Sequence, residues 1–192
     1  MNKCVLYYKE WLKLKRQDFR IMNMLALSEN SKFTGNLTDL CKRFSLSPQD
    51  NNRKRIKKSI ELLEENNFIT VNRSGRTYIL NVIPKETEIE VKKDWIETIL
   101  STKEFSESIS KEAVIKCLLW LLNNKEYIIT DKNIAEDLDC CIDTITKAKN
   151  VLQNDFNLIL KTSITEKINN YYRRKGQHID INAWINKRNR SI

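Results

Sequence analysis

The sequence predicts a mainly helical α+β protein with two similar modules, in each of which several helices precede a small β-hairpin. Three observations support this prediction. The 192 residues include only 3 Gly and 2 Pro, which favours helices joined by short connections. Apolar residues recur at helical spacing in both halves, and short segments rich in β-branched and aromatic residues follow the helices. We expect a first module over residues 1–83, an acidic helical connector over 84–108 and a second module over 109–192.

Composition narrows the class of protein. Hydrophobic residues make up 41% and charged residues 31% of the chain, as is typical of globular proteins. The first twenty residues carry charges throughout, and the longest apolar run (117–122) is far shorter than the ~20 residues that a membrane span needs. The five cysteines form no C-x-x-C pair. We therefore expect a reduced, cytoplasmic protein without membrane association, and a redox or metal role for the adjacent Cys140 and Cys141 is the alternative.

The net charge of +9 is unevenly distributed along the chain. Residues 1–83 hold 16 Lys/Arg against 8 Asp/Glu, which gives +8. Residues 84–110 hold 4 against 7, which gives −3, and residues 111–192 hold 14 against 10, which gives +4. Two basic regions that flank an acidic connector favour a polyanionic partner over charge that serves solubility alone.

The second half of the chain shows a succession of elements that can be followed in order. Residues 109–124 have the apolar spacing of an amphipathic helix, with inward positions at Val114, Cys117, Leu118, Leu121 and Leu122. Residues 127–130 are a short strand candidate, after which Asp131 is expected to cap a short helix. The apolar residues of that helix are Ile134, Ala135 and Leu138. A longer helix follows, with an inner face made of Ile145, Ala148 and Leu152. Two strands, over 158–164 and 177–185, then flank a basic tip.

This order of elements resembles the winged helix-turn-helix family of DNA-binding proteins, over most of 109–185. The residues that carry the resemblance are Ile134, Ala135, Leu138, Asp143, Thr144, Ile145, Thr146, Lys147 and Leu152. The resemblance implies that the second of the two central helices enters the major groove. Its outward positions, which become candidate DNA contacts, are Thr144, Thr146, Lys147 and Asn150. Asp139 stands where the family usually has a turn glycine, and Cys141 stands where a small hydroxyl residue usually caps the helix. A helical hairpin without a DNA role is the alternative.

The first module repeats this order at an offset of 89 residues, which aligns Ile56 with Ile145. Residues 17–30 predict a helix with one apolar face, made of Phe19, Met22, Leu25 and Ala26. A short strand at Phe33 and a short helix over 37–44 follow. Ser47-Pro48-Gln49-Asp50 then has the pattern of a helix start, with Ser47 as the cap.

The helix that starts there is the candidate recognition helix of the first module. Its inner face is made of Ile56, Ile60 and Leu63. Its first half is basic and contains Arg53, Lys54, Arg55, Lys57 and Lys58, and we add the preceding Asn51 to the candidate contacts. The helix dipole favours acids at this end, so the observed order indicates a phosphate backbone nearby. A solvated basic face is the alternative. Three of these residues align with outward positions of the second module: Arg55 with Thr144, Lys57 with Thr146 and Lys58 with Lys147.

The two hairpins are also basic. In the first module, strands over 68–72 and 77–83 flank a turn at Gly75, beside which lie Arg73 and Arg76. The tip in the second module carries Tyr171, Tyr172, Arg173, Arg174 and Lys175. Such hairpins could reach a neighbouring phosphate or the minor groove, and the alternative for the tyrosines is packing.

Two segments outside the modules carry apolar residues. In the connector, the spacing of Ile89, Lys92, Ile96 and either Ile99 or Leu100 predicts a helix that packs between the modules or forms a homodimer contact. The N-terminal segment contains Tyr7, Tyr8, Trp11, Leu12 and Leu14. These residues are too apolar for a solvated tail, so we expect them to dock on the first module or to contribute to a homodimer.

These features predict a sequence-specific double-stranded DNA-binding protein that acts as a transcriptional regulator. The tandem arrangement also resembles plasmid and phage replication initiators, which leaves replication initiation or DNA transfer as alternatives, together with a protein–protein adaptor. No enzymatic activity, metal or cofactor is expected, because the chain has no Gly-rich phosphate loop, nucleophile elbow or cluster of metal ligands. His178 is the one histidine, and a lone histidine in a strand is more often structural.

Overall fold

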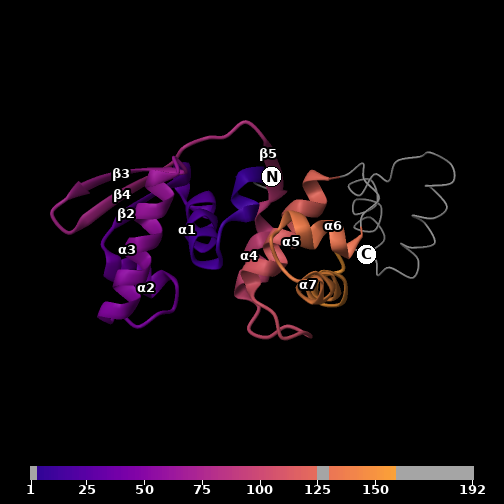
Figure 1. Cartoon of the computed structure of the whole chain (residues 1–192). Helices are drawn as coiled ribbons and strands as arrows, with labels where there is room; N and C mark the ends of the chain where they lie inside the picture. The colour runs from indigo at the N-terminus through magenta and orange to yellow at the C-terminus, as the bar shows by residue number, and fades with distance from the viewer. Residues whose placement is uncertain (1–3, 125–129, 159–192) are drawn as a thin grey trace. The chain divides into compact units, whose positions relative to one another are not determined.

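The structure is a computed structural model that describes residues 4–124 and 130–158 (Figure 1). It is an α+β protein with several helices and small sheets, as the sequence predicts. The chain divides into two compact units. The N-terminal unit is Val5–Glu88, and the C-terminal unit begins at Ile89 and includes Cys4.

The N-terminal unit contains the order of elements expected for the first module. Two short 3₁₀ helices, η1 and η2, lie before and after the first α-helix. The elements are η1 (Lys9–Lys13), α1 (Arg16–Leu27), η2 (Glu29–Ser31), β2 (Lys32–Gly35), α2 (Leu37–Arg43), α3 (Asp50–Glu65), β3 (Ile69–Ser74) and β4 (Thr77–Val82). In Figure 1 the β3–β4 hairpin extends away from the end of α3.

The sheet of this unit is antiparallel, with strand order β2-β4-β3. Leu80 of the central strand pairs with Phe33 on one side and Val71 on the other, and its side chain is fully buried. Gly75 and Arg76 form the two-residue turn of the hairpin. Gly75 adopts a φ of 56°, a left-handed conformation that glycine reaches without steric cost.

The core of the N-terminal unit lies between α1, α3 and the sheet. Both predicted apolar faces are confirmed, because α1 buries Phe19, Met22, Leu25 and Ala26, and α3 buries Ile56, Ile60 and Leu63. Helix α3 also contacts α2 and β3. The opposite side of α3 is therefore the side that faces solvent.

The N-terminal segment packs on this unit, as expected. Tyr7, Tyr8, Trp11 and Leu12 are all buried. The Tyr7 hydroxyl donates a hydrogen bond to Oδ1 of Asn23 on α1, and burial raises the pKa of Tyr7. Because these side chains are already covered, they do not provide a free apolar surface for a homodimer.

The predicted start of the recognition helix is wrong by two residues. Helix α3 begins at Asp50 with Gln49 as its N-cap, and Gln49 makes no side-chain capping hydrogen bond. The first helical hydrogen bond runs from the Arg53 N–H to the Gln49 carbonyl, 3.0 Å apart. The Ser47 hydroxyl instead accepts from Nδ2 of Asn52 at 3.3 Å, so it is used by a side chain rather than by the helix N-terminus.

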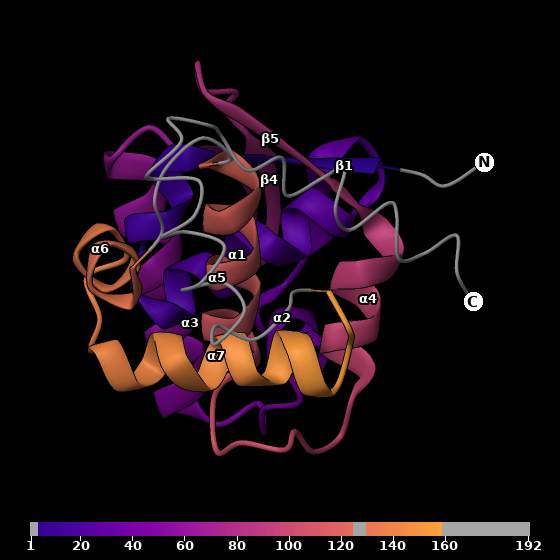
Figure 2. The same cartoon turned by 90° about the vertical axis from the view of Figure 1, so that its right-hand side faces the viewer.

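The described part of the C-terminal unit has a helical core. The helices from the connector onward are α4 (Lys93–Ser101), α5 (Lys111–Asn123), α6 (Asp131–Asp137) and α7 (Ile142–Asn154). Helix α7 crosses α5 and contacts α6 (Figure 2). The predicted inner positions are confirmed: α5 buries Val114, Cys117, Leu118, Leu121 and Leu122, and α6 and α7 bury Ile134, Ala135, Leu138, Ile145, Ala148 and Leu152.

The predicted helical connector is only partly helical. Residues 88–92 form strand β5 (Glu88–Lys92), and a further strand, β1 (Cys4–Tyr8), lies at the N-terminal end of the described residues. Ile89 and Val91 are buried while Glu88 and Glu90 are exposed, which is the alternation of a strand. The helix begins only at Lys93, and residues 102–110 are not helical.

Several predictions lie wholly or largely outside the described residues. These are the strands over 127–130, 158–164 and 177–185, His178, and the second hairpin tip with Tyr171, Tyr172, Arg173, Arg174 and Lys175. Within the described part of the chain, none of the helices has the length and apolar character to cross a bilayer.

Candidate nucleic-acid interface

The exposed side of α3 carries a compact group of basic residues. With Ile56 and Ile60 directed into the core, the side chains of Lys54, Arg55, Lys57 and Lys58 are exposed. Asn51 is exposed in the first turn, and the Arg53 side chain is 43% exposed. Residues three or four apart lie on one helix face, so Lys58 is a neighbour of both Lys54 and Arg55.

These cations differ in whether the protein already neutralises them. Arg53 contacts Asp50 at 2.6 Å, and Lys57 is 3.7 Å from Glu61. Lys54, Arg55 and Lys58 have no ion-pair or hydrogen-bond partner among the described residues. Three cations of this face are thus uncompensated. The exposed ion pair between Lys57 and Glu61 is of a kind that contributes little to stability.

The hairpin adds two arginines with different surroundings. Arg73 lies 3.6 Å from Glu64 of α3, and its guanidinium is 5.4 Å from the centre of the Tyr78 ring. These contacts hold Arg73 against Glu64 of α3 and the Tyr78 ring, close to the turn of the hairpin. Arg76, in the turn beside Gly75, is exposed and has no such partner within the described structure.

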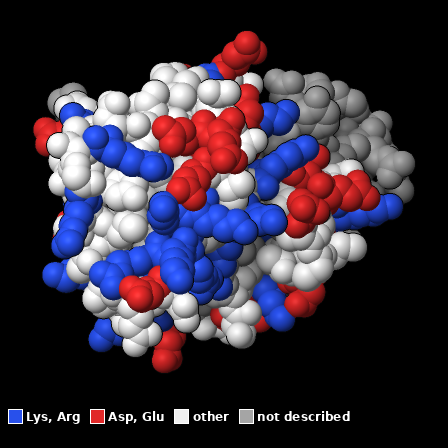
Figure 3. All heavy atoms as spheres, turned by 60° about the vertical axis from the view of Figure 1, so that its left-hand side comes forward, with Lys and Arg blue, Asp and Glu red and all other residues white. Residues whose placement is uncertain are grey.

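Basic residues prevail over this whole region. From α2 through β4 (37–82), nine Lys/Arg stand against five Asp/Glu, which gives +4. Figure 3 shows Lys and Arg side chains gathered on one face, with groups of acidic side chains beside them. This region is the candidate nucleic-acid interface.

The corresponding helix of the C-terminal unit, α7, has a different surface. All four of its predicted contact residues have partners within the protein. The Thr146 hydroxyl donates to Oδ2 of Asp131 at 2.8 Å, and Nδ2 of Asn150 donates to Oε1 of Glu107 at 2.7 Å. The Lys147 ammonium lies 2.7 Å from Oδ2 of Asp143, which raises the pKa of Lys147.

The fourth residue, Thr144, contacts the cysteine that caps the helix. Cys141 occupies the N-cap position, as predicted, without a side-chain capping hydrogen bond to the backbone. Its Sγ lies 3.0 Å from Oγ1 of Thr144, and this hydrogen bond lowers the pKa of Cys141. Cys141 and Cys140 are both free thiols. Asp139 in the preceding turn adopts a φ of 50°, which agrees with its placement at the position of a turn glycine.

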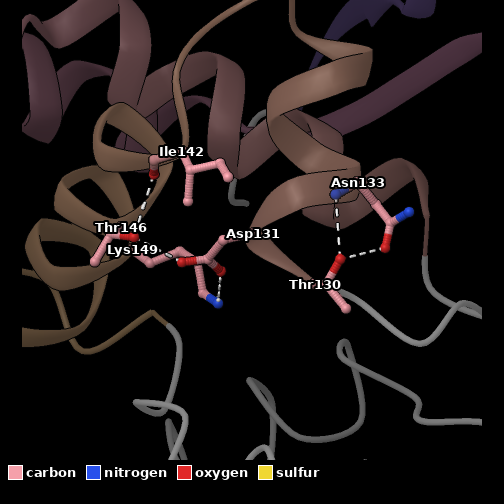
Figure 4. A network of polar contacts seen from close by, with 6 residues as sticks. All are labelled: Thr130, Asp131, Asn133, Ile142, Thr146 and Lys149. Carbon is pink, nitrogen blue, oxygen red and sulfur yellow. Dashed lines mark hydrogen bonds and ion pairs between the residues drawn. The ribbon is translucent and has the colours of Figure 1, made fainter.

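Lys149 of α7, which the sequence does not mark as functional, is a buried lysine that lies between α6 and α7. Lys149 directs its ammonium to Oδ1 of Asp131 at 2.6 Å, and its side chain is only 11% exposed (Figure 4). Asp131 therefore joins α6 to α7 through Lys149 and Thr146. The predicted cap role of Asp131 is wrong, because Thr130 is the N-cap of α6 and its hydroxyl accepts from the Asn133 N–H at 3.2 Å.

The charge around α6 and α7 is the reverse of that around α3. Residues 131–158 contain three Lys/Arg against six Asp/Glu, which gives −3. The excess of basic residues in the second module comes instead from 159–192, with eight Lys/Arg against two Asp/Glu, and these lie outside the described residues. Among the residues that are described, no three His, Cys, Asp or Glu are grouped as metal ligands.

Comparisons with protein families, with curated proteins and with solved structures found no match to this chain. The candidate interface therefore stands on the geometry and charge of these residues alone.

Proposed function

We propose that this protein binds double-stranded DNA through a winged helix in its N-terminal unit, with α3 as the recognition helix. The succession of helix, strand, two helices and hairpin supports this assignment, as does the sheet order β2-β4-β3. In such a protein the second of two adjacent helices enters the major groove, which is about 12 Å wide and admits an α-helix. The hairpin then lies where it can contact the neighbouring backbone.

The observation that carries the proposal is the set of uncompensated cations on α3. Lys54, Arg55 and Lys58 are exposed on one side of a helix whose other side is fixed in the core by Ile56, Ile60 and Leu63. They lie in the first half of the helix, where the dipole disfavours positive charge. A phosphate backbone would satisfy all three and release their counterions, which supplies a large part of DNA affinity.

Direct measurement of duplex binding tests this proposal. Each phosphate contact contributes about 0.9 log unit to affinity at 0.1 M salt, so Lys54→Ala/Lys58→Ala should weaken binding by about 30- to 100-fold. Fluorescence anisotropy with a labelled duplex would measure this change. The charge-matched control Lys103→Ala/Lys132→Ala removes two exposed lysines of the C-terminal unit and should change affinity by less than about twofold. Equal losses in the two variants would contradict a role for α3.

We further propose that the bound DNA has a preferred sequence and that the role is transcriptional regulation. Arg55 is the residue we assign to base reading, because arginine can bond both acceptors of a guanine edge. Selection from random duplexes should yield a motif that Arg55→Ala relaxes at one position, at a cost of about 1–3 kcal/mol. The location of that motif, at promoters or in repeats at a replication origin, separates regulation from replication initiation. Absence of duplex binding would favour a protein–protein adaptor instead.

A further inference from the structure

We infer that α7 is not a second recognition helix and that, of the helices that the structure describes, α3 is the one that enters a major groove. This inference rests on the proposed DNA binding and specifies which of the two predicted helices performs it. The sequence predicts equivalent roles for α3 and α7, because Ile56 aligns with Ile145. In the structure both of these residues are buried. The two helices differ in whether their outward side chains already have partners within the protein.

The first nine residues of the two helices differ in available charge. Residues 50–58 of α3 hold five bases against one acid, which gives +4. Residues 142–150 of α7 hold Lys147, Lys149 and Asp143, which gives +1. Lys149 is turned inward to Asp131, and Lys147 is held by Asp143. Once these two pairs are formed, α7 offers no uncompensated cation to a phosphate.

The outward polar groups of α7 are engaged as well. Thr146 donates to Asp131, and Asn150 donates to Glu107, which lies outside the helix. A base edge or phosphate could take these donors only by displacing a carboxylate. The carboxylates of Asp131, Asp143 and Glu107 would then remain beside the DNA, where like charges repel.

Displacement would also weaken the unit itself. Asp131 is the partner of Lys149, whose side chain is 11% exposed, and Thr146 shares the same carboxylate. Loss of one partner of a poorly solvated ion pair leaves a charge that neither water nor protein compensates. The arrangement that would expose α7 to DNA thus breaks the link between α6 and α7, whereas α3 binds without any such rearrangement.

Substitutions on the two helices distinguish these roles. Lys147→Ala/Asn150→Ala removes both charged and polar candidates from α7 and should leave duplex affinity within about twofold of the wild type, while Lys54→Ala/Lys58→Ala lowers it by at least about 30-fold. Asp143→Asn removes a repelling charge and should not weaken binding. Thermal unfolding of each variant would show that the fold is retained.

A chemical footprint provides the same test without substitution. Reductive methylation of lysines, read by mass spectrometry with and without duplex, should show protection of Lys54 and Lys58 and none of Lys147. Loss of affinity in the α7 variant together with the α3 variant, or protection of Lys147, would overturn the inference and leave the proposed function intact. Full affinity of the α3 variant, together with unprotected Lys54 and Lys58 in the wild type, would instead remove the proposed function, and the inference with it.

Discussion

At the scale of single residues, the exposed thiols Cys4 and Cys141 have opposite surroundings. A hydrogen bond with Glu90 raises the pKa of Cys4, whereas the Thr144 hydroxyl lowers that of Cys141. The thiolate is the reactive form, so iodoacetamide should alkylate Cys141 faster than Cys4 at about pH 7.5. Burial raises the pKa of Cys117 to about 12, and this thiol should react only after unfolding. Peptide mapping by mass spectrometry would measure all three rates.

Thr144→Val provides the control for this expectation. Valine has a similar shape but no hydroxyl, so the pKa of Cys141 should rise and its alkylation should slow, while Cys4 remains unchanged. An unaltered Cys141 rate in this variant would show that the hydrogen bond with Thr144 does not govern the reactivity of the thiol.

Single residues also show where local sequence rules failed. Ser47 and Asp131 both belong to the residue types that favour helix N-caps, yet neither is one. Ser47 accepts a hydrogen bond from the Asn52 side chain. Asp131 forms an ion pair with Lys149, eighteen residues further along the chain. Local spacing gives no information about the second contact, because it depends on how α6 packs on α7.

At the scale of elements, Asp131 and Lys149 should stabilise the contact between α6 and α7. Asp131→Ala leaves the Lys149 ammonium nearly buried without its partner, and we expect the free energy of unfolding to fall by about 2–4 kcal/mol. Lys149→Met keeps most of the side-chain volume and leaves Asp131 its Thr146 donor, so the loss should be smaller, about 1–2 kcal/mol. Urea unfolding would measure both values.

The double variant Asp131→Ala/Lys149→Met distinguishes pairing from simple loss of packing. If the two residues act as a pair, the combined loss should be at least about 1 kcal/mol less than the sum of the single losses. Lys132→Ala is the matched control, since its exposed pair with Glu136 is 3.7 Å long and should contribute less than about 0.5 kcal/mol. Strict additivity would show that Lys149 and Asp131 contribute independently.

The sequence predicted those elements whose apolar period is long enough to be unambiguous. In α3 and α7 the inward positions recur over about two turns, and all of them are buried. The segment over 88–92 was assigned to a helix because Ile89 and Ile96 fit a helical spacing. Its five residues alternate between exposed and buried as a strand does. A segment this short does not decide between a helix and a strand by its local spacing alone.

At the scale of the whole molecule, the contact positions of the two helices could be predicted but their availability could not. Alignment of Ile56 with Ile145 identified which residues face outward in both units. It could not show that Asp131 and Glu107, which lie on other segments, satisfy Thr146 and Asn150. The two helices therefore correspond in their core positions and differ in whether their outward polar side chains have partners within the described protein.

Dependence of DNA affinity on salt follows from the number of cations that remain available. Lys42, Lys54, Arg55, Lys58 and Arg76 have no ion-pair partner in the described part of the N-terminal unit, and Arg53, Lys57 and Arg73 are held only by partly exposed pairs. If about five to eight of these neutralise phosphates, the slope of log affinity against log salt should lie between about −4 and −7. Titrations of a duplex at several salt concentrations would give this slope.

The variant Lys54→Ala/Lys58→Ala should make the salt slope shallower by about two, because two counterion-releasing contacts are lost. The variant Lys147→Ala/Asn150→Ala should leave the slope unchanged. A slope near zero, or one that changes equally in both variants, would contradict a DNA interface formed by α2, α3 and the β3–β4 hairpin.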